Sequence, residues 1–224
     1  MHASDTRPRL LIAGIVLATV LVVTSCGGDG EPATPAPTEA ERVVAELGLH
    51  GSAFAEPLAK PDFVLTDTEG GSFDFLEATR GQVTLLYFGY TNCPDVCPIH
   101  MANIAAALDQ MPPELSRHVR VVFVGVDAPR DTPERVREWL DFFSEDFVGL
   151  TGTPDELEAA QLAAFVPVAF VDQQLEGGGY TVSHAGWLYL YTTDDLAHLR
   201  YPSGIRQAAW AHDLSVLVED GWPS

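Results

Sequence analysis

Cysteine is scarce in this chain: three residues in 224, at positions 26, 93 and 97. A small secreted domain held together by disulfides carries several cysteine pairs at wider spacing. The scarcity therefore excludes a disulfide scaffold. A structural zinc site needs four Cys or His ligands, and no second cysteine pair is present to complete one beside Cys93 and Cys97.

Basic residues are also few, with 12 Lys and Arg against 32 Asp and Glu and a formal net charge of −20. Nucleic acids and anionic membrane surfaces are bound through clusters of Lys and Arg. The balance argues against both partners for the domain surface. We interpret the acidic excess as a solvated surface.

The N-terminus has an apolar run too short for an ordinary membrane span. Arg7 and Arg9 precede the run Leu10 to Val23, about 14 residues where a span needs roughly 20. The run ends in Val23-Thr-Ser-Cys26, which resembles a bacterial lipobox. Residues 1–26 are therefore predicted to be a lipoprotein signal peptide with Cys26 as the lipidated residue. An uncleaved anchor helix is the alternative, and either one would tether the domain to the extracytoplasmic face of a bacterial cell membrane.

Residues 27–57 are predicted to be a flexible linker, and 58–221 the folded domain. The segment up to about residue 38 consists largely of Gly, Pro, Ala, Thr and Glu without an apolar period, and residues 39–49 could form a short helix. The linker would leave the domain free to move beside the membrane.

The apolar pattern of the domain predicts an α/β fold. Strands near 62–66 and 72–75 form a hairpin, and continuous apolar runs at 83–88 and 119–126 indicate strands buried on both faces. Helices are expected after residue 97, after Thr132, from Thr153 to about 164, and at 204–219. A short strand is expected at 147–152, and an antiparallel pair at 180–184 and 187–191. The order predicts a thioredoxin-like fold: a central mixed sheet flanked by helices, with an N-terminal hairpin.

The stretch from Tyr87 to Pro98 carries the chemistry. It leaves a buried strand, turns at Gly89, and presents Cys93 and Cys97 where a helix should begin. Pro98 suits a first helical turn, because its missing N–H would have no partner there. A helix N-terminus favours thiolate over thiol, the form that binds soft metals and attacks disulfides.

The spacing leaves metal binding and redox chemistry both open. Cα atoms about one helical turn apart can still be bridged by a disulfide. Two thiolates and one imidazole suit copper, and seven histidines could supply the imidazole. His100, three residues after Cys97, and His184, at the end of a strand run, are the candidates; the pattern favours His184 over His100 but leaves both open. The other histidines fall in the signal, the linker or isolated positions: His2, His50, His118, His198 and His212.

Four stretches resemble the Sco/SenC family of copper chaperones for cytochrome oxidase assembly. They occur in the family's order, at residues 87–98, 126–134, 148–153 and 180–184, and the similarity runs from about Pro61 to Val218. The resemblance implies copper, one per chain, held by Cys93, Cys97 and His184. It also matches Asp127 to an acidic position near the site, beside the metal or in docking. A strand-end acidic residue that merely begins a turn is the alternative for Asp127.

The resemblance further implies a function: delivery of copper to the dinuclear copper site of cytochrome c oxidase subunit II. A membrane-tethered thiol–disulfide reductase that keeps that client's cysteines reduced is the leading alternative, and it would not need His184. A peroxiredoxin-like peroxidase is less favoured because the cysteine motif lacks an Arg, and copper storage because Met- or His-rich tracts are lacking. The chain departs from the family pattern at Ala128, at 185–187 and at 192–195.

Overall fold

The protein is described by a computed structural model that covers residues 36–175 and 177–223. The predicted signal peptide and Cys26 lie outside these residues. The described helices are α1 (Glu39–Leu47), α2 (Phe75–Thr79), α3 (Val96–Gln110), α4 (Pro113–Ser116), α5 (Pro133–Leu140), α6 (Pro154–Ala163) and α7 (Gln207–Glu219). The described strands are β1 (Ser52–Ala59), β2 (Val64–Asp67), β3 (Ser72–Asp74), β4 (Val83–Gly89), β5 (Val119–Gly125), β6 (Val148–Thr151), β7 (Phe170–Gln174), β8 (Tyr180–Ser183), β9 (Leu188–Tyr191) and β10 (Leu196–Tyr201).

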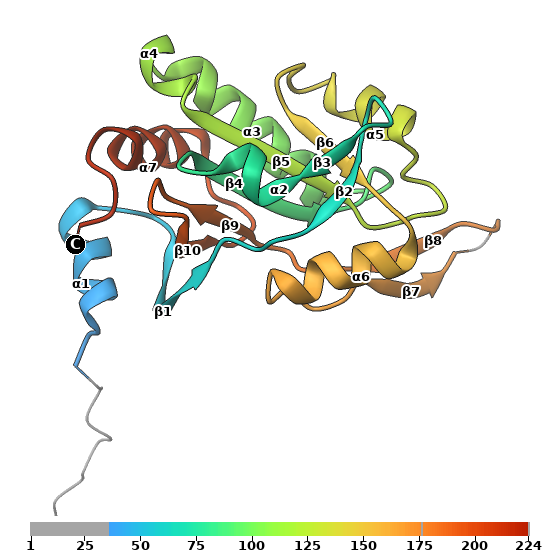
Figure 1. Cartoon of the computed structure of the whole chain (residues 1–224), viewed down its shortest axis with the longest axis horizontal. Helices are drawn as coiled ribbons and strands as arrows, with labels where there is room; N and C mark the ends of the chain where they lie inside the picture. Colours follow the sequence, from blue (N-terminus) through green and yellow to red (C-terminus); the bar gives the residue numbers. More distant parts are fainter. Residues whose placement is uncertain (1–35, 176, 224) are drawn as a thin grey trace, which may run out of the picture. The chain divides into compact units, whose positions relative to one another are not determined.

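One mixed sheet forms the centre of the fold, in the order β1-β10-β9-β4-β5-β6-β2-β3 (Figure 1). β4, β5 and β6 are parallel, and the remaining neighbours pair antiparallel. The predicted hairpin is β2 and β3, at one edge of the sheet. The mixed sheet with helices on both faces confirms the predicted fold class.

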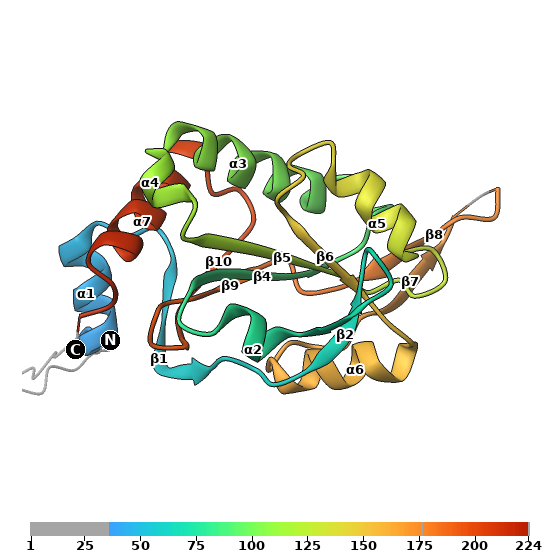
Figure 2. The same ribbon diagram turned by 45° about the horizontal axis from the view of Figure 1, so that its top comes forward.

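Alternate side chains of the central strands enter two separate cores. Leu85 and Tyr87 of β4 pack on one face under α3, α5 and α7, whereas Leu86 and Phe88 pack on the other face with α2 and α6. Figure 2 shows these helices on opposite sides of the sheet. Cys97 belongs to the first core, so the cysteine motif lies at the α3 face.

Local capping fixes where several helices begin, as the sequence predicted. Thr132 accepts a hydrogen bond from the backbone of Arg135 at the start of α5. Thr153 and Glu156 form a reciprocal capping box at the start of α6. These contacts involve residues three apart, which is why the sequence alone reveals them.

The predicted pairing of 180–184 with 187–191 is wrong. β8 pairs instead with β7, in a separate two-stranded sheet, and β9 lies between β10 and β4. All four residues of β9 are buried, as suits an inner strand, whereas β7 is exposed along its length. Residues 184–187 therefore connect two sheets rather than closing a hairpin, which leaves His184 on a loop.

The structured unit begins earlier than residue 58. The compact unit starts at Pro37, and both α1 and β1 fall within the range predicted as linker. β1 pairs with β10 at the edge of the main sheet. His50 also joins this segment to the domain, because its backbone N–H and ring nitrogen bond the buried Asp213 of α7 at 2.7 and 2.8 Å.

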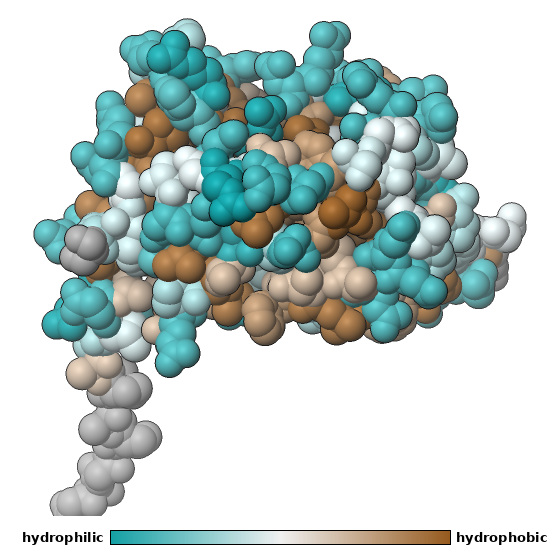
Figure 3. Space-filling view, in the orientation of Figure 1, coloured by the Kyte–Doolittle hydropathy of each residue, from teal (hydrophilic) through white to brown (hydrophobic). Residues whose placement is uncertain are grey.

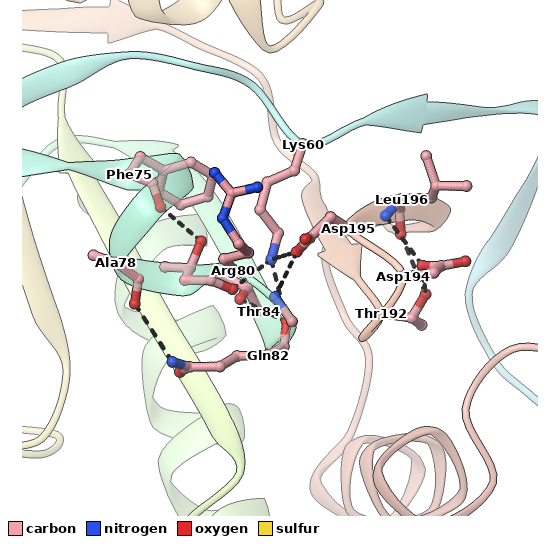
Figure 4. A network of polar contacts seen from close by, with 12 residues as sticks. Lys60, Phe75, Ala78, Arg80, Gln82, Thr84, Thr192, Asp194, Asp195 and Leu196 are labelled. Atoms are coloured by element: carbon pink, nitrogen blue, oxygen red, sulfur yellow. Dashed lines mark hydrogen bonds and ion pairs between the residues drawn. The ribbon is translucent and has the colours of Figure 1, made fainter.

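Lys60 ties the end of β1 to two loops (Figure 4). Its buried ammonium group donates to the carbonyl of Thr79 at 2.7 Å and pairs with Asp195 at 2.7 Å. Asp195 also accepts a hydrogen bond from the backbone of Gly81 at 2.8 Å. The turn after β9 is thereby fixed to the loop before β4.

The surface is mainly polar, with apolar side chains gathered near α6. Figure 3 shows brown side chains along the lower edge, where α6 lies. Leu162 and Phe165 at the end of this helix are 57% and 67% exposed. Among the described residues, none of the helices combines the length and apolarity that crossing a bilayer requires.

Candidate metal centre

The thiols lie where β4 passes into α3. Gly89 ends the strand, and a Cβ at this position would lie 3.0 Å from Cys97 Sγ and 2.8 Å from a ring carbon of Phe123. Glycine is therefore required for Cys97 to pack against the strand end. Cys97 is fully buried in the first turn of α3, and its backbone N–H donates to Cys93 Sγ at 3.4 Å.

His184 reaches this turn from the loop after β8. Its Nε2 lies 3.6 Å from Cys97 Sγ. Its Nδ1 lies 3.0 Å from the carbonyl oxygens of both Phe88 and Ala185, so Nδ1 donates to these carbonyls and Nε2 faces the thiols. Within the described ranges, Cys93, Cys97 and His184 form one group whose ligand atoms all lie within 4.8 Å of one another.

The two thiols differ in protonation. A hydrogen bond from Cys97, aided by His184 and backbone N–H groups, lowers the pKa of Cys93 to about 3 despite partial burial. Burial raises the pKa of Cys97 well above its usual value, and the Cys93 thiolate raises it further. Burial also raises the pKa of Tyr87, whose hydroxyl donates to Cys97 Sγ at 3.3 Å. At neutral pH the pair is thus one thiolate and one thiol.

Asp127 does not belong to the ligand group. It contacts residues that hold the strand leading into the His184 loop. It is buried, and it accepts hydrogen bonds from the Tyr180 hydroxyl at 2.8 Å and from Arg130. Arg130 stacks on the Tyr180 ring at 3.6 Å and donates to the Tyr180 carbonyl at 3.1 Å. Because Tyr180 begins the strand that ends beside His184, these contacts fix the approach of the loop.

Comparison with known proteins identifies the family to which a chain with this site belongs. The model of the SCO1/SenC family matches residues 52–219, which is most of the chain. The chain belongs to the SCO1/SenC family. It is 37% identical over 153 residues to Protein SenC of Rhodobacter capsulatus, a match that covers 64% of this chain and 63% of that protein. The chain thus spans less than two thirds of this relative's length.

Solved Sco structures share the fold. ScoI of Bradyrhizobium japonicum, with copper bound, is 31% identical and superposes with a TM-score of 0.62 over 70% of this chain and 97% of that one. The apo Sco1 protein of Thermus thermophilus is 30% identical, with a TM-score of 0.67 over 75% and 96% of the two chains. These relatives are thioredoxin-like, in agreement with the fold described above.

A buried carboxylate that no sequence pattern indicated holds the cysteine turn in this SCO1/SenC chain. Asp131 is fully buried and accepts hydrogen bonds from the Thr91 backbone at 3.0 Å and the Thr91 hydroxyl at 2.7 Å. It also accepts one from the backbone of Asp127 at 3.1 Å. Asp131 lies 40 residues from Thr91 in sequence, so no local pattern indicates this contact.

The remaining described histidines bond elsewhere. His100 is buried next to the site, but its Nε2 faces the Gly186 carbonyl at 3.3 Å. His198 pairs with Asp194, and His212 contacts the Leu47 carbonyl. The structure thus brings His184, and not His100, into the ligand group of this SCO1/SenC chain.

The thiolate character of Cys93 predicts how its alkylation rate depends on pH. An ordinary thiol, with a pKa of about 8.5, reacts faster with iodoacetamide as pH rises through that value. Because the pKa of Cys93 is lowered to about 3, its thiolate is lost only as pH falls toward that value. We expect the alkylation rate of Cys93 in the reduced, metal-free chain to stay flat between roughly pH 5.5 and 8.

Mass-spectrometric peptide mapping would follow each cysteine separately. Buried Cys97 should be alkylated far more slowly than half-buried Cys93 over the same range. The denatured chain is the control, in which Cys93 and Cys97 should both show the ordinary rise. A rise for folded Cys93 centred on the ordinary thiol pKa would contradict the assignment.

Proposed function

We propose that this chain is a copper chaperone that binds one copper through Cys93, Cys97 and His184. The observation that carries the proposal is the convergence of two sulfurs and an imidazole nitrogen within 4.8 Å of one another. This donor set fits copper: thiolates favour Cu(I), and imidazole helps to hold Cu(II). The copper-bound structure of Bradyrhizobium ScoI supports the same metal.

The three ligands differ in how firmly they are held, which suits transfer. Cys93 and Cys97 lie on a turn fixed by Asp131 and by the packing of Gly89, whereas His184 lies on a loop between two sheets. Departure of His184 would open one coordination position while both sulfurs still hold the metal. A partner's thiolate could then enter and begin ligand exchange.

We further propose that the recipient is the dinuclear copper site of cytochrome c oxidase subunit II. Sco proteins are cytochrome c oxidase assembly proteins, which supports a client of this kind. Lipidation at Cys26 would tether the domain to the extracytoplasmic face of the membrane. A tether raises the effective concentration of the chaperone near a membrane-bound client.

A thiol–disulfide reductase is the second candidate, favoured by the pKa difference between the two cysteines. The Cys93 thiolate would attack a client disulfide, giving a mixed disulfide and a client thiolate. Cys97 would then attack Cys93 Sγ, and its proton would pass to the second client thiolate that leaves. The client gains two electrons, and the chain is left with a Cys93–Cys97 disulfide that cannot bind copper.

One experiment separates the two functions. The full-length chain in detergent, reduced and loaded with copper, is mixed with the soluble domain of subunit II carrying reduced cysteines. The chaperone function predicts that the absorption of the dinuclear copper centre appears while the chain loses its metal. A chain carrying His184→Ala should bind or transfer copper less well.

The complementary arm uses metal-free, reduced chain and subunit II domain whose cysteines are oxidised. Rapid reduction of that disulfide, together with no copper transfer in the first arm, would overturn the chaperone function and establish the reductase. His184→Ala should then behave as the wild type, because thiol exchange does not need the imidazole.

A further inference from the structure

His100 is a buried polar side chain that the ligand set does not use. It is 2% exposed, lies one turn after Cys97 on α3, and places its ring 5.0 Å from that of Tyr87. Its Nε2 lies 3.3 Å from the carbonyl oxygen of Gly186. Burial lowers the pKa of His100, so the ring is neutral, and its one N–H donates to that carbonyl.

Gly186 belongs to the loop that carries His184. Residues 184–187 lie in no helix or strand and connect β8 of one sheet to β9 of the other. Ala185 and Trp187 pack against the second core, whereas a Cβ at Gly186 would meet nothing within 4 Å. The hydrogen bond from His100 therefore fixes a backbone position two residues after the predicted ligand.

α3 contacts this loop at two points that lie one helical turn apart. Cys97 Sγ faces His184 Nε2 at 3.6 Å, and one helical turn later His100 faces Gly186. Tyr87 joins them, because it donates to Cys97 and packs against both imidazole rings. The helix that carries a thiol thus also holds the backbone of the imidazole loop.

We propose that His100 is a positioning residue that latches the His184 loop onto α3 through its hydrogen bond to the Gly186 carbonyl. The latch sets how much of the time His184 Nε2 faces the thiols, and its release lets His184 leave while Cys93 and Cys97 stay in place. The effect on metal affinity rests on the copper-binding function proposed above. The effect on the loop does not, because the hydrogen bond exists without metal.

The variant His100→Phe tests the latch in the full-length chain, since it keeps an aromatic ring against Tyr87 and removes the donor. One buried hydrogen bond is worth about a factor of ten in an equilibrium. In the metal-free, reduced chain, amide hydrogen exchange of residues 184–188 should accelerate roughly tenfold. Copper(II) affinity, measured by competition with a chelator, should fall by about the same factor, because the imidazole chiefly helps to hold Cu(II).

Two further variants separate positioning from general stability. His100→Gln retains an N–H donor and should restore at least part of the slow exchange and of the affinity. Ile104→Val, a buried core change on the same helix, should lower overall stability without selectively accelerating exchange of the loop. If His100→Phe does not fold, His100→Leu replaces it in the same measurements of loop exchange and copper affinity.

A double-mutant cycle with His184→Ala decides whether His100 acts through His184. The latch predicts that His100→Phe has no added effect on copper(II) affinity once His184 is absent. An equal loss in both backgrounds, or unchanged loop exchange in the metal-free His100→Phe chain, would overturn the proposal. If wild type binds no copper, the proposed function fails, while the exchange comparison still tests the latch.

Discussion

Replacing Cys97 with serine is expected to abolish stoichiometric copper binding. Its sulfur is fully buried at the centre of the ligand group, where Cys93, His184 and Tyr87 all face it. A serine hydroxyl is a hard, protonated group that does not replace a thiolate on copper. Structural zinc sites with four ligands are worth roughly 10–16 kcal/mol, and by the same scale loss of one ligand should weaken binding on the order of 100-fold.

Replacing His184 with alanine should weaken copper binding less than Cys97→Ser does, and it should affect Cu(II) more than Cu(I). Two thiolates can still hold Cu(I), which accepts low coordination, whereas Cu(II) loses the imidazole that helps to hold it. Titration of the reduced full-length chain with Cu(II) should give a sulfur-to-copper charge-transfer band at one copper per chain in the wild type. The band should be lost or altered in His184→Ala and absent in Cys97→Ser.

His118→Ala is the matched control, because this histidine is exposed and its ring neighbours Arg117 rather than the thiols. It should leave both the band and the stoichiometry unchanged. Identical spectra for the wild type and His184→Ala would mean that the site is a dithiol without an imidazole ligand. The reductase function would then be the better explanation.

Replacing Asp131 with alanine is expected to lower the free energy of unfolding by about 2–4 kcal/mol. Its carboxylate accepts three hydrogen bonds, two of them from backbone N–H groups of Thr91 and Asp127. Alanine would leave those buried donors without an acceptor and open a cavity where Asp131 packs against Gly125. Urea unfolding of the reduced, metal-free chain, followed by circular dichroism, would measure the loss.

Asp141→Ala is the control for this change, since Asp141 is about half exposed and pairs with Arg137 at the surface. Exposed ion pairs contribute between about 0 and 1 kcal/mol, so this variant should differ little from the wild type. Asp131→Asn should lie between the two, because the amide keeps one acceptor oxygen. A loss below about 1 kcal/mol for Asp131→Ala would contradict the structural role assigned here.

Features that depend on residues close together in the chain could be predicted from the amino-acid sequence. Apolar periodicity located the central strands, and Thr132 and Thr153 identified helix starts through contacts three residues apart. The cysteine motif at a strand-to-helix turn was also local, as was the place of Pro98 in the first turn of α3. The sequence context only favoured His184 over His100, and the family resemblance was needed to assign it as the third ligand.

Contacts between residues 40 to 90 positions apart could be identified only in the folded chain. His184 meets Cys97 across 87 residues, and Asp131 meets Thr91 across 40. The wrong pairing of β8 has the same origin: two short strand runs close in sequence predict a hairpin, yet β9 is an inner strand of the main sheet. Strand pairing and buried hydrogen bonds depend on which distant surfaces are covered together, and no local pattern encodes that choice.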